Sequence, residues 1–400
     1  MKIARARLLS LVTLLAVVTL SCRMLSSQPA STPTTAPIHT PVAQEDTPAP
    51  PIQVATPHGF AGTAVPVAAT PVQAIVDDIQ IDYLYTYNLV TALYHLYGSV
   101  LDHFVDVTLT NNGSEPVRVV VTTEVVGYTT HAIDTVEIPA NESIELHQDP
   151  RLEPQAVDQL NAQKPGTFHI KVVWLDQGDE KVLLDETDQI IIYSRRDFVW
   201  LPGFTTQEEY ELWAAWVTPN DPAVEALLRA AADYDSTGII VGGYGDEPDD
   251  GDGSVWRRLE AVWEAEDNVY NLTYINTTTT FGPNSVQRMR LPAEVLDQAS
   301  GNCVELAALY ASVAEAMGLE AAIIRIPGHA YAAIRTDEEN ANYYFVETTL
   351  IGRATFSDAV SVGNDEWNDA QPHFDAEEEG YAWVTIPDAR EKGILPIPWN

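Results

Sequence analysis

Hydrophobic and polar residues alternate along several short segments in the first half of the chain. The alternating or β-branched segments are residues 105–110, 117–126, 168–174, 182–184 and 190–193. Turn-forming residues such as Asn111-Asn112-Gly113 separate these segments. Short alternating strands with turns between them predict an all-β antiparallel sandwich, of the immunoglobulin-like kind, over residues 75–198. The tyrosine-rich segment 81–97 is compatible with either a strand or a helix.

Helical patterns replace this alternation after Trp200. Asp221 followed by Pro222 combines a helix cap with a proline at the first helical position, which predicts a helix over residues 222–233. The apolar face of a second predicted helix consists of Val255, Leu259, Val262 and Trp263. The tryptophans of this region fit either a sugar-stacking platform or a core, and their helical spacing favours the core. These are Trp213, Trp216, Trp256 and Trp263. Residues 199–400 are therefore predicted to form a second, α+β domain.

The segment that follows residue 300 predicts a buried helix and then three strands. Ser300-Gly301-Asn302 is a cap, the residues from Cys303 to Met317 are good helix formers, and Gly318 ends the helix. The predicted strands are residues 320–326, 329–335 and 342–347. Because consecutive elements usually lie side by side, His329 at the start of one strand and Glu347 at the end of the next can meet the beginning of the helix.

Three residues of this segment indicate nucleophilic catalysis. In the first turn of a helix, Cys303 faces the positive end of the helix dipole, which favours the reactive thiolate. The unpaired N–H groups there also suit an oxyanion. His329 would transfer the proton and Glu347 would orient the imidazole. Gln298, five residues before the cysteine, is a candidate for a second oxyanion donor. The structural alternative is an inert buried cysteine, a core histidine and a surface acid.

Three short motifs carry a family resemblance. Residues 301–307, 327–331 and 345–349 run GNCVELA, PGHAY and FVETT. They resemble the motifs of the transglutaminase-like superfamily, most closely between Arg288 and Gly352. The resemblance implies a papain-like α+β core with the cysteine on its central helix and the histidine and acid on neighbouring strands. It also implies acyl transfer, either hydrolysis of peptide or amide bonds or glutamine–lysine cross-linking. The family usually has Asp, followed by x-Thr, where this chain has Glu347.

The N-terminus has the features of an export signal. Lys2, Arg5 and Arg7 precede the apolar run Leu8–Leu20, which is too short for an ordinary membrane span. Ser21-Cys22 follows, so segment 1–22 resembles a bacterial lipoprotein signal with lipid attached to Cys22, although Thr19 stands where that signal prefers Leu. An uncleaved anchor and plain secretion are the alternatives. The Pro-, Thr- and Ala-rich residues 23–74 predict a disordered tether.

Charge limits the partners of the protein. The chain has 58 acidic residues against 21 basic ones, a net charge of −37, which repels the phosphates of nucleic acids. The histidines of the β region lack metal-ligand spacing, and we predict no metal site and no cofactor. The acidic loop 246–252 departs from the calcium-loop pattern, so cation binding there is a subsidiary hypothesis. If Cys22 carries lipid, Cys303 is the sole thiol of the mature chain, and no disulfide forms within it.

Two functions therefore compete. The first is an extracytoplasmic, membrane-anchored cysteine hydrolase or transamidase that acts on a protein or peptide, such as a cell-wall peptide, through Cys303, His329 and Glu347. The second is a non-catalytic cell-surface binding or scaffold module. In that case the transglutaminase-like part is degenerate and the sandwich binds the partner.

Overall fold

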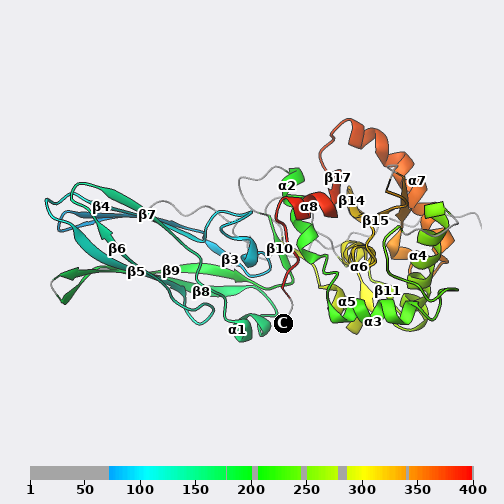
Figure 1. Ribbon diagram of the computed structural model, residues 1–400, viewed down its shortest axis with the longest axis horizontal. Helices are drawn as coiled ribbons and strands as arrows, with labels where there is room; N and C mark the ends of the chain where they lie inside the picture. Colours follow the sequence, from blue (N-terminus) through cyan, green and yellow to red (C-terminus); the bar gives the residue numbers. More distant parts are fainter. Residues whose placement is uncertain are drawn as a thin grey trace, which may run out of the picture. The chain divides into compact units, whose positions relative to one another are not determined.

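A computed structural model describes residues 72–176, 178–200, 206–244, 250–277, 286–338 and 342–398. The predicted signal segment 1–22 with Cys22, and the predicted tether up to residue 71, lie outside these ranges. No helix within them is long and apolar enough to cross a membrane. The described chain runs through a β-rich N-terminal region and then through a mixed α/β region (Figure 1).

The β-rich region contains two sheets that share one core. The strands of the first, in spatial order, are β1 (Val72–Val76), β2 (Ile79–Tyr85), β4 (Val105–Asn111) and β7 (Ser143–Gln148). The second, in spatial order, consists of β3 (Asn88–Val90), β9 (Asp179–Tyr193), β8 (Lys164–Asp176), β5 (Val117–Val125) and β6 (Ala132–Ile138). Ile81 and Val107 of one sheet join Val119 and Val172 of the other in a single buried cluster. The residues that alternate along each strand therefore supply the apolar face that each sheet buries.

The antiparallel prediction is confirmed for most of this region and wrong at one edge. All strands of the first sheet pair antiparallel, but β3 pairs with β9 in parallel. Only Thr86 and Tyr87 separate β2 from β3, so the chain passes directly from one sheet to the edge of the other. The ambiguous segment 81–97 contains strand residues and also a short 3-10 helix, Tyr94–Leu96. The first strand begins at Val72, three residues before the predicted boundary, and a short helix α1 (Pro154–Asp158) precedes β8.

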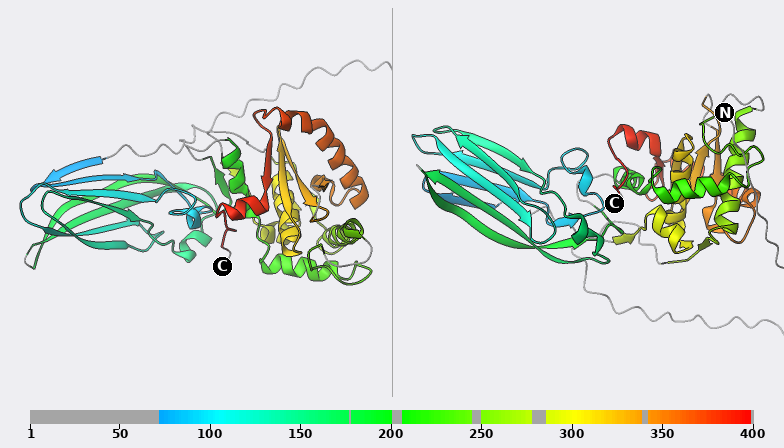
Figure 2. Two further views of the ribbon diagram at one scale, coloured as in Figure 1. Left: turned by 45° about the horizontal axis from the view of Figure 1, so that its top comes forward. Right: turned by 60° about the horizontal axis from the view of Figure 1, so that its bottom comes forward.

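The α/β region is built around helix α6 (Cys303–Ala316). An antiparallel sheet lies against it, with β16 (Tyr343–Val346), β15 (His329–Arg335), β14 (Ala321–Ile326) and β17 (Ala382–Thr385) in spatial order (Figure 2). The surrounding helices are α2 (Thr206–Glu211), α3 (Pro222–Ala231), α4 (Asp250–Asn268), α5 (Pro292–Asp297), α7 (Phe356–Asp375) and α8 (Ile386–Glu391). Two pairs of short strands complete the region: β10 (Asp197–Val199) with β12 (Val286–Arg288), and β11 (Thr273–Tyr274) with β13 (Ser300–Gly301).

The sequence pattern of α6 explains its central place. Every residue from Cys303 to Ala314 is buried, because nearly all of them are apolar and no face of the helix suits water. Asn302 caps the helix as predicted. Gly318, with φ +82°, follows its end in the left-handed conformation that glycine adopts without strain. The predicted helix and the three predicted strands after it are thus confirmed.

The aromatic core of the α/β region also agrees with the sequence. Trp213, Trp216 and Trp263 are fully buried, and the partly buried Trp256 packs against the same hydrophobic cluster, so the core interpretation is confirmed. One boundary was wrong: α4 begins at Asp250, so the end of the predicted acidic loop 246–252 is helical. The preceding residues 245–249 lie outside the described chain.

Glu266 is a carboxyl group buried in the core of this region. Its side chain lies on α4, and within the described residues its Oε1 has no hydrogen-bond partner. Burial raises the pKa of Glu266 to about 8. The group is therefore mostly neutral at pH 7 in the folded chain, whereas an unfolded chain would ionise it.

The raised pKa of Glu266 predicts a stability that falls with pH. Its contribution is complete below the ordinary pKa of 4.5 and is lost as the pH rises towards about 8, by at most ~1.4 kcal/mol per pH unit. We expect Glu266→Gln to be more stable than the wild type at pH 7, with a gap that widens upward from pH 5. Urea unfolding at several pH values measures this gap. The exposed Glu264→Gln on the same helix is the control, and equal pH slopes for the two variants would contradict the prediction.

Candidate active site

The local structure around Cys303 places it at the first position of α6. The Asn302 side chain accepts a hydrogen bond from the Glu305 N–H at 3.0 Å, and the Glu305 carboxylate accepts one from the Asn302 N–H at 2.9 Å. Immediately before this capping box, β13 pairs with β11 in parallel. The chain is therefore fixed on both sides of the cysteine where the helix begins. The N–H groups of the first turn point out of this N-terminal end.

His329 and Glu347 come together through the register of the sheet. Pro327-Gly328 turns the chain between β14 and β15, with Gly328 at φ +78°, and His329 is the first residue of β15. Strand β16 pairs with β15 and ends at Val346, which places Glu347 directly after it. His329 Nε2 lies 2.5 Å from Glu347 Oε2. The main-chain N–H of Thr349 donates to the other carboxylate oxygen at 2.8 Å, so both oxygens are held.

Cys303 is the third member of this group. Only 2 % of its surface is exposed, but its surroundings are not purely aliphatic. Cys303 raises the pKa of His329 through a side-chain hydrogen bond and through its charge, as Glu347 also does. Because Nε2 faces Glu347, Nδ1 is the ring nitrogen left for the sulfur. The structure thus brings the three residues predicted from the sequence into one chain of contacts, in the order sulfur, imidazole, carboxylate.

Burial and partner charges act in opposite directions on this group. Burial disfavours the charged imidazole, but the hydrogen bonds to Cys303 and Glu347 outweigh it and raise the pKa of His329 to about 10. Burial also opposes ionisation of Glu347, yet the hydrogen bond from His329 holds the pKa of that carboxyl below its usual range. At neutral pH the site therefore contains an imidazolium bound to a carboxylate.

A second carboxyl group, Glu366 on α7, joins the site. Its Oε2 is 3.8 Å from His329 Nε2. Burial, and next the charge of Glu347, raise the pKa of Glu366 to about 8, so it is mostly protonated at neutral pH and shares a hydrogen bond with Glu347. Helix α7 approaches closely because Gly363 is buried against β16, where a Cβ would clash with the Phe345 carbonyl oxygen. The sequence analysis missed Glu366, because an acid on an amphipathic helix is ordinarily exposed.

Tyr274 on β11 is the other residue that the sequence analysis missed. Its ring is half-buried. Burial is the largest cause that raises the pKa of Tyr274, and the charges of Cys303 and Glu347 raise it further. The phenol therefore lies within electrostatic range of both residues. The guanidinium of Arg353 lies 5.8 Å from the ring centroid. No spacing signal could have identified Tyr274, because it reaches Cys303 only through the pairing of β11 with β13.

The site also contains a group of side chains that could bind a metal ion. Ligand atoms of His329, Glu347 and Glu366 lie within 4.8 Å of one another. The sequence prediction of no metal site rested on spacing along the chain, and these three residues come from two strand ends and a helix. The hydrogen bond between His329 and Glu347 occupies the atoms that a metal ion would need, so ion binding would break the dyad.

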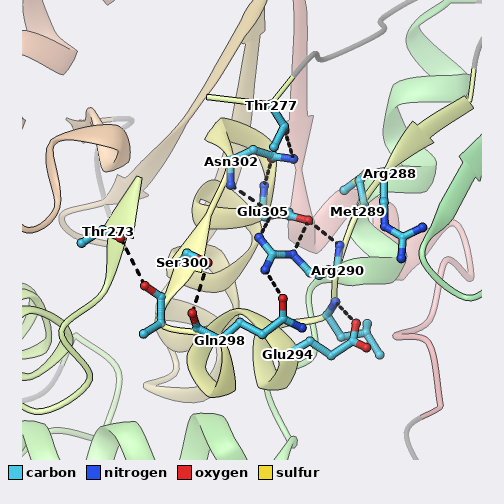
Figure 3. A network of polar contacts seen from close by, with 12 residues as sticks. Thr273, Thr277, Arg288, Met289, Arg290, Glu294, Gln298, Ser300, Asn302 and Glu305 are labelled. Carbon is cyan, nitrogen blue, oxygen red and sulfur yellow. Dashed lines mark hydrogen bonds and ion pairs between the residues drawn. The ribbon is translucent and has the colours of Figure 1, made fainter. Parts of the chain in front are cut away.

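Gln298 belongs to the network of polar contacts around Arg290 and Glu305, beside the capping box (Figure 3). Its Oε1 accepts a hydrogen bond from Arg290 Nη1 at 2.7 Å, and the guanidinium of Arg290 also binds the buried Glu305 through Nε at 3.0 Å and Nη2 at 2.7 Å. Within the described residues Gln298 is hydrogen-bonded to Arg290 and not to Cys303, so its role at an oxyanion stays a prediction.

Comparison with known proteins identifies the region that carries the site. Residues 281–364 match the model of the transglutaminase-like superfamily. The chain contains a transglutaminase-like domain. The matched segment includes Cys303, His329 and Glu347, whereas Tyr274 and Glu366 lie outside it.

The remaining comparisons add little. A search of curated proteins finds no match. Among solved structures, a protein from Archaeoglobus fulgidus is similar at 10 % identity over 32 % of this chain and 98 % of its own, with a TM-score of 0.19. A FixG-related protein from Vibrio parahaemolyticus is similar at 16 % identity over 29 % of this chain and 98 % of its own, with a TM-score of 0.18. Scores this low carry no argument about function.

The buried ion pair of Glu305 with Arg290 predicts a large loss of stability when it is broken. Glu305→Ala leaves Arg290 buried without its carboxylate and removes half of the capping box, so we expect a loss of about 3–5 kcal/mol in the free energy of unfolding. Urea denaturation followed by tryptophan fluorescence measures it. Glu320→Ala, which breaks the more exposed pair with Arg335, is the control and should cost under ~1 kcal/mol. Equal losses in the two variants would contradict this account.

The raised pKa of His329 predicts an imidazolium that persists far above neutral pH. Its stabilising contribution is complete below the ordinary pKa of 6.5 and is lost as the pH rises towards about 10. NMR titration of the His329 ring, assigned with His329→Ala, should show a midpoint well above 8. Glu347→Gln should lower that midpoint, whereas Glu378→Gln, beside His373 on the exposed end of α7, should not. A wild-type midpoint near 6.5 would refute the ion pair.

Proposed function

We propose that the transglutaminase-like domain catalyses thiol-dependent acyl transfer on peptide or amide bonds. The observation that carries this proposal is the chain of contacts from Cys303 through His329 to Glu347, with the imidazole held protonated. An imidazolium beside a cysteine is the partner that a thiolate nucleophile requires. The contacts within this group are the support for a catalytic triad of Cys303, His329 and Glu347.

The reaction would proceed in two steps. The Cys303 sulfur attacks the carbonyl carbon of the substrate and a C–S bond forms, while N–H groups at the start of α6 stabilise the oxyanion. Imidazolium then gives its proton to the amide nitrogen, the C–N bond breaks and the amine leaves. Water or a second amine next attacks the thioester, neutral His329 takes the proton of that nucleophile, and Cys303 is released. Water gives hydrolysis and an amine gives transamidation.

Glu347 fits this mechanism despite the usual aspartate of the family. Its longer side chain reaches His329 through one oxygen and Thr349 through the other, so the x-Thr part of the motif still holds the carboxylate. Glu366 would act through Glu347 as a positioning residue. The protonated carboxyl of Glu366 can donate a hydrogen bond to the ionised carboxylate of Glu347. Because Glu366 keeps its proton, two negative charges do not lie side by side.

The setting of the domain belongs to the same proposal. The two sheets of the β-rich region agree with an immunoglobulin-like sandwich over residues 75–198, and the central α6 with its sheet agrees with a papain-like domain over residues 199–400. Segment 1–22 would direct export and Cys22 would carry lipid, with residues 23–74 as the tether. The protein would then act outside the cytoplasm at the membrane surface.

The burial of the Cys303 sulfur favours a second candidate, a non-catalytic surface module, because substrate must reach that atom.

Alkylation across pH tests the nucleophile directly. In a Cys22→Ser background Cys303 is the only thiol, and we expect iodoacetamide to label it at pH 6.5 at a rate within about threefold of that at pH 9. His329→Ala should slow labelling at pH 6.5 by about tenfold or more and restore a steep rise towards alkaline pH. Mass spectrometry of quenched samples measures the rates. Steep and equal pH dependence in both proteins would refute an activated cysteine.

Turnover separates the enzyme from the surface module. Wild-type protein should release ammonia from a glutamine-containing peptide library, or incorporate a labelled primary amine into it. Cys303→Ala should lose at least about 1,000-fold in rate with an unchanged unfolding midpoint. A residual rate in Cys303→Ala equal to that of the wild type would favour the non-catalytic module.

A further inference from the structure

A cavity of about 440 Å³ adjoins the start of α6. The residues of its lining that bear charge or face the start of the helix are Arg196, Arg288, Arg290, Gln298, Asn302 and Glu305. Asn302 and Glu305 lie on either side of Cys303 in the sequence and belong to its capping box. The cavity therefore adjoins the capping box that holds the proposed nucleophile in place.

The charge of this cavity is opposite to that of the protein. The whole chain has a net charge of −37, but three arginines and one glutamate line the cavity. Glu294, which pairs with Arg196 from outside the lining, reduces the excess but leaves one positive charge uncompensated. Among only 21 basic residues in the chain, three meet at one cavity beside the site. A local positive charge in such a chain favours an anionic ligand.

Two of the three arginines are already engaged by the protein. Arg290 is buried and holds Glu305 and Gln298, so it is a fixed part of the wall. Arg196 donates from Nε to Glu294 Oε1 at 2.6 Å. These ion pairs make the wall rigid and consume much of the hydrogen-bonding capacity of both guanidinium groups.

Arg288 differs from them. It is exposed at the end of β12, and its Nη1 donates a hydrogen bond to the main-chain oxygen of Asn161 at 3.2 Å. Within the described residues it has no carboxylate partner, and Figure 3 shows its guanidinium apart from the network around Arg290. Gln298 also faces this space: its Oε1 is held by Arg290, which leaves its amide N–H groups as donors.

We propose that this cavity binds a carboxylate of the acyl-donor substrate, with Arg288 as its principal contact and the Gln298 amide as a second donor. The substrate class is then a peptide with an acidic group next to the amide that Cys303 attacks. A planar guanidinium with free N–H groups matches a carboxylate in two parallel hydrogen bonds, which supports a carboxylate over a rounder anion. This inference rests on the proposed function, because it assigns the cavity to the substrate of the acyl-transfer reaction.

Binding to an inactive full-length chain tests the cavity without any turnover. The probes are two capped tetrapeptides that differ at one position, the residue after a central glutamine, which is aspartate in one and asparagine in the other. Calorimetry with Cys303→Ala should give at least about tenfold tighter binding of the aspartate peptide, and the preference should shrink from 50 to 500 mM NaCl.

Matched arginine variants decide the assignment. In the Cys303→Ala background, Arg288→Gln should remove the preference for the aspartate peptide, whereas Arg229→Gln, exposed on α3, should keep it. Inorganic phosphate at 10 mM should compete weakly. Equal affinity for the two peptides, a preference that survives Arg288→Gln, or complete displacement by phosphate would each overturn the proposal.

The two proposals fail separately in these experiments. Charge-selective binding that depends on Arg288, in a protein whose wild type shows no turnover, would refute the acyl-transfer function and keep the carboxylate site. Turnover with equal kcat/KM for acidic and neutral peptides would keep the enzyme and refute the site. In an active wild type, Arg288→Gln should raise KM for the acidic peptide about tenfold with little change in kcat.

Discussion

One buried carboxylate fixes the beginning of the central helix. Glu305 accepts hydrogen bonds from the main chain of Asn302 and from the main chain and guanidinium of Arg290. A buried carboxylate without such partners would cost several kcal/mol, so the segment around Arg290 and the first turn of α6 are held as one unit. Cys303 lies between Asn302 and Glu305, and its place is therefore set before any substrate arrives.

The chemistry of the site depends on which of three neighbouring side chains carry a proton: His329, Glu347 and Glu366. Glu347 keeps its charge because His329 and Thr349 donate hydrogen bonds to it, whereas Glu366, beside that charge and partly buried, keeps a proton. When two neighbouring carboxyl groups have different surroundings, their pKa values differ, and the two groups can then take different roles in a reaction. The result here is an imidazole that is charged at neutral pH, beside a sulfur that would need a positive partner.

The distribution of charge separates long-range from short-range effects. The acidic surface repels an acidic peptide at a distance, but salt screens that repulsion beyond roughly 8 Å at physiological ionic strength. Close to the site, the arginine-lined cavity reverses the sign of the interaction. Recognition of an acidic group would thus depend on contact with Arg288 rather than on attraction from afar, and this favours selectivity over speed of encounter.

The sequence by itself determined the elements that depend on local pattern. Alternation in the β strands, the apolar content of α6, the cap at Asn302 and the turn at Gly328 each follow from neighbours in the chain, and the motifs around Cys303, His329 and Glu347 carried the family. Tertiary structure alone decided what long-range contacts control: the parallel edge strand β3, the approach of Tyr274 through strand pairing, and that of Glu366 through the close packing of Gly363 on Phe345. It also decided the gathering of three arginines at one cavity. Arg288 and Arg290 are close in the sequence, but Arg196 reaches them only because β10 pairs with β12 and the main chain of Met289 bonds that of Arg196. Such a long-range contact is not encoded in any local pattern of the sequence.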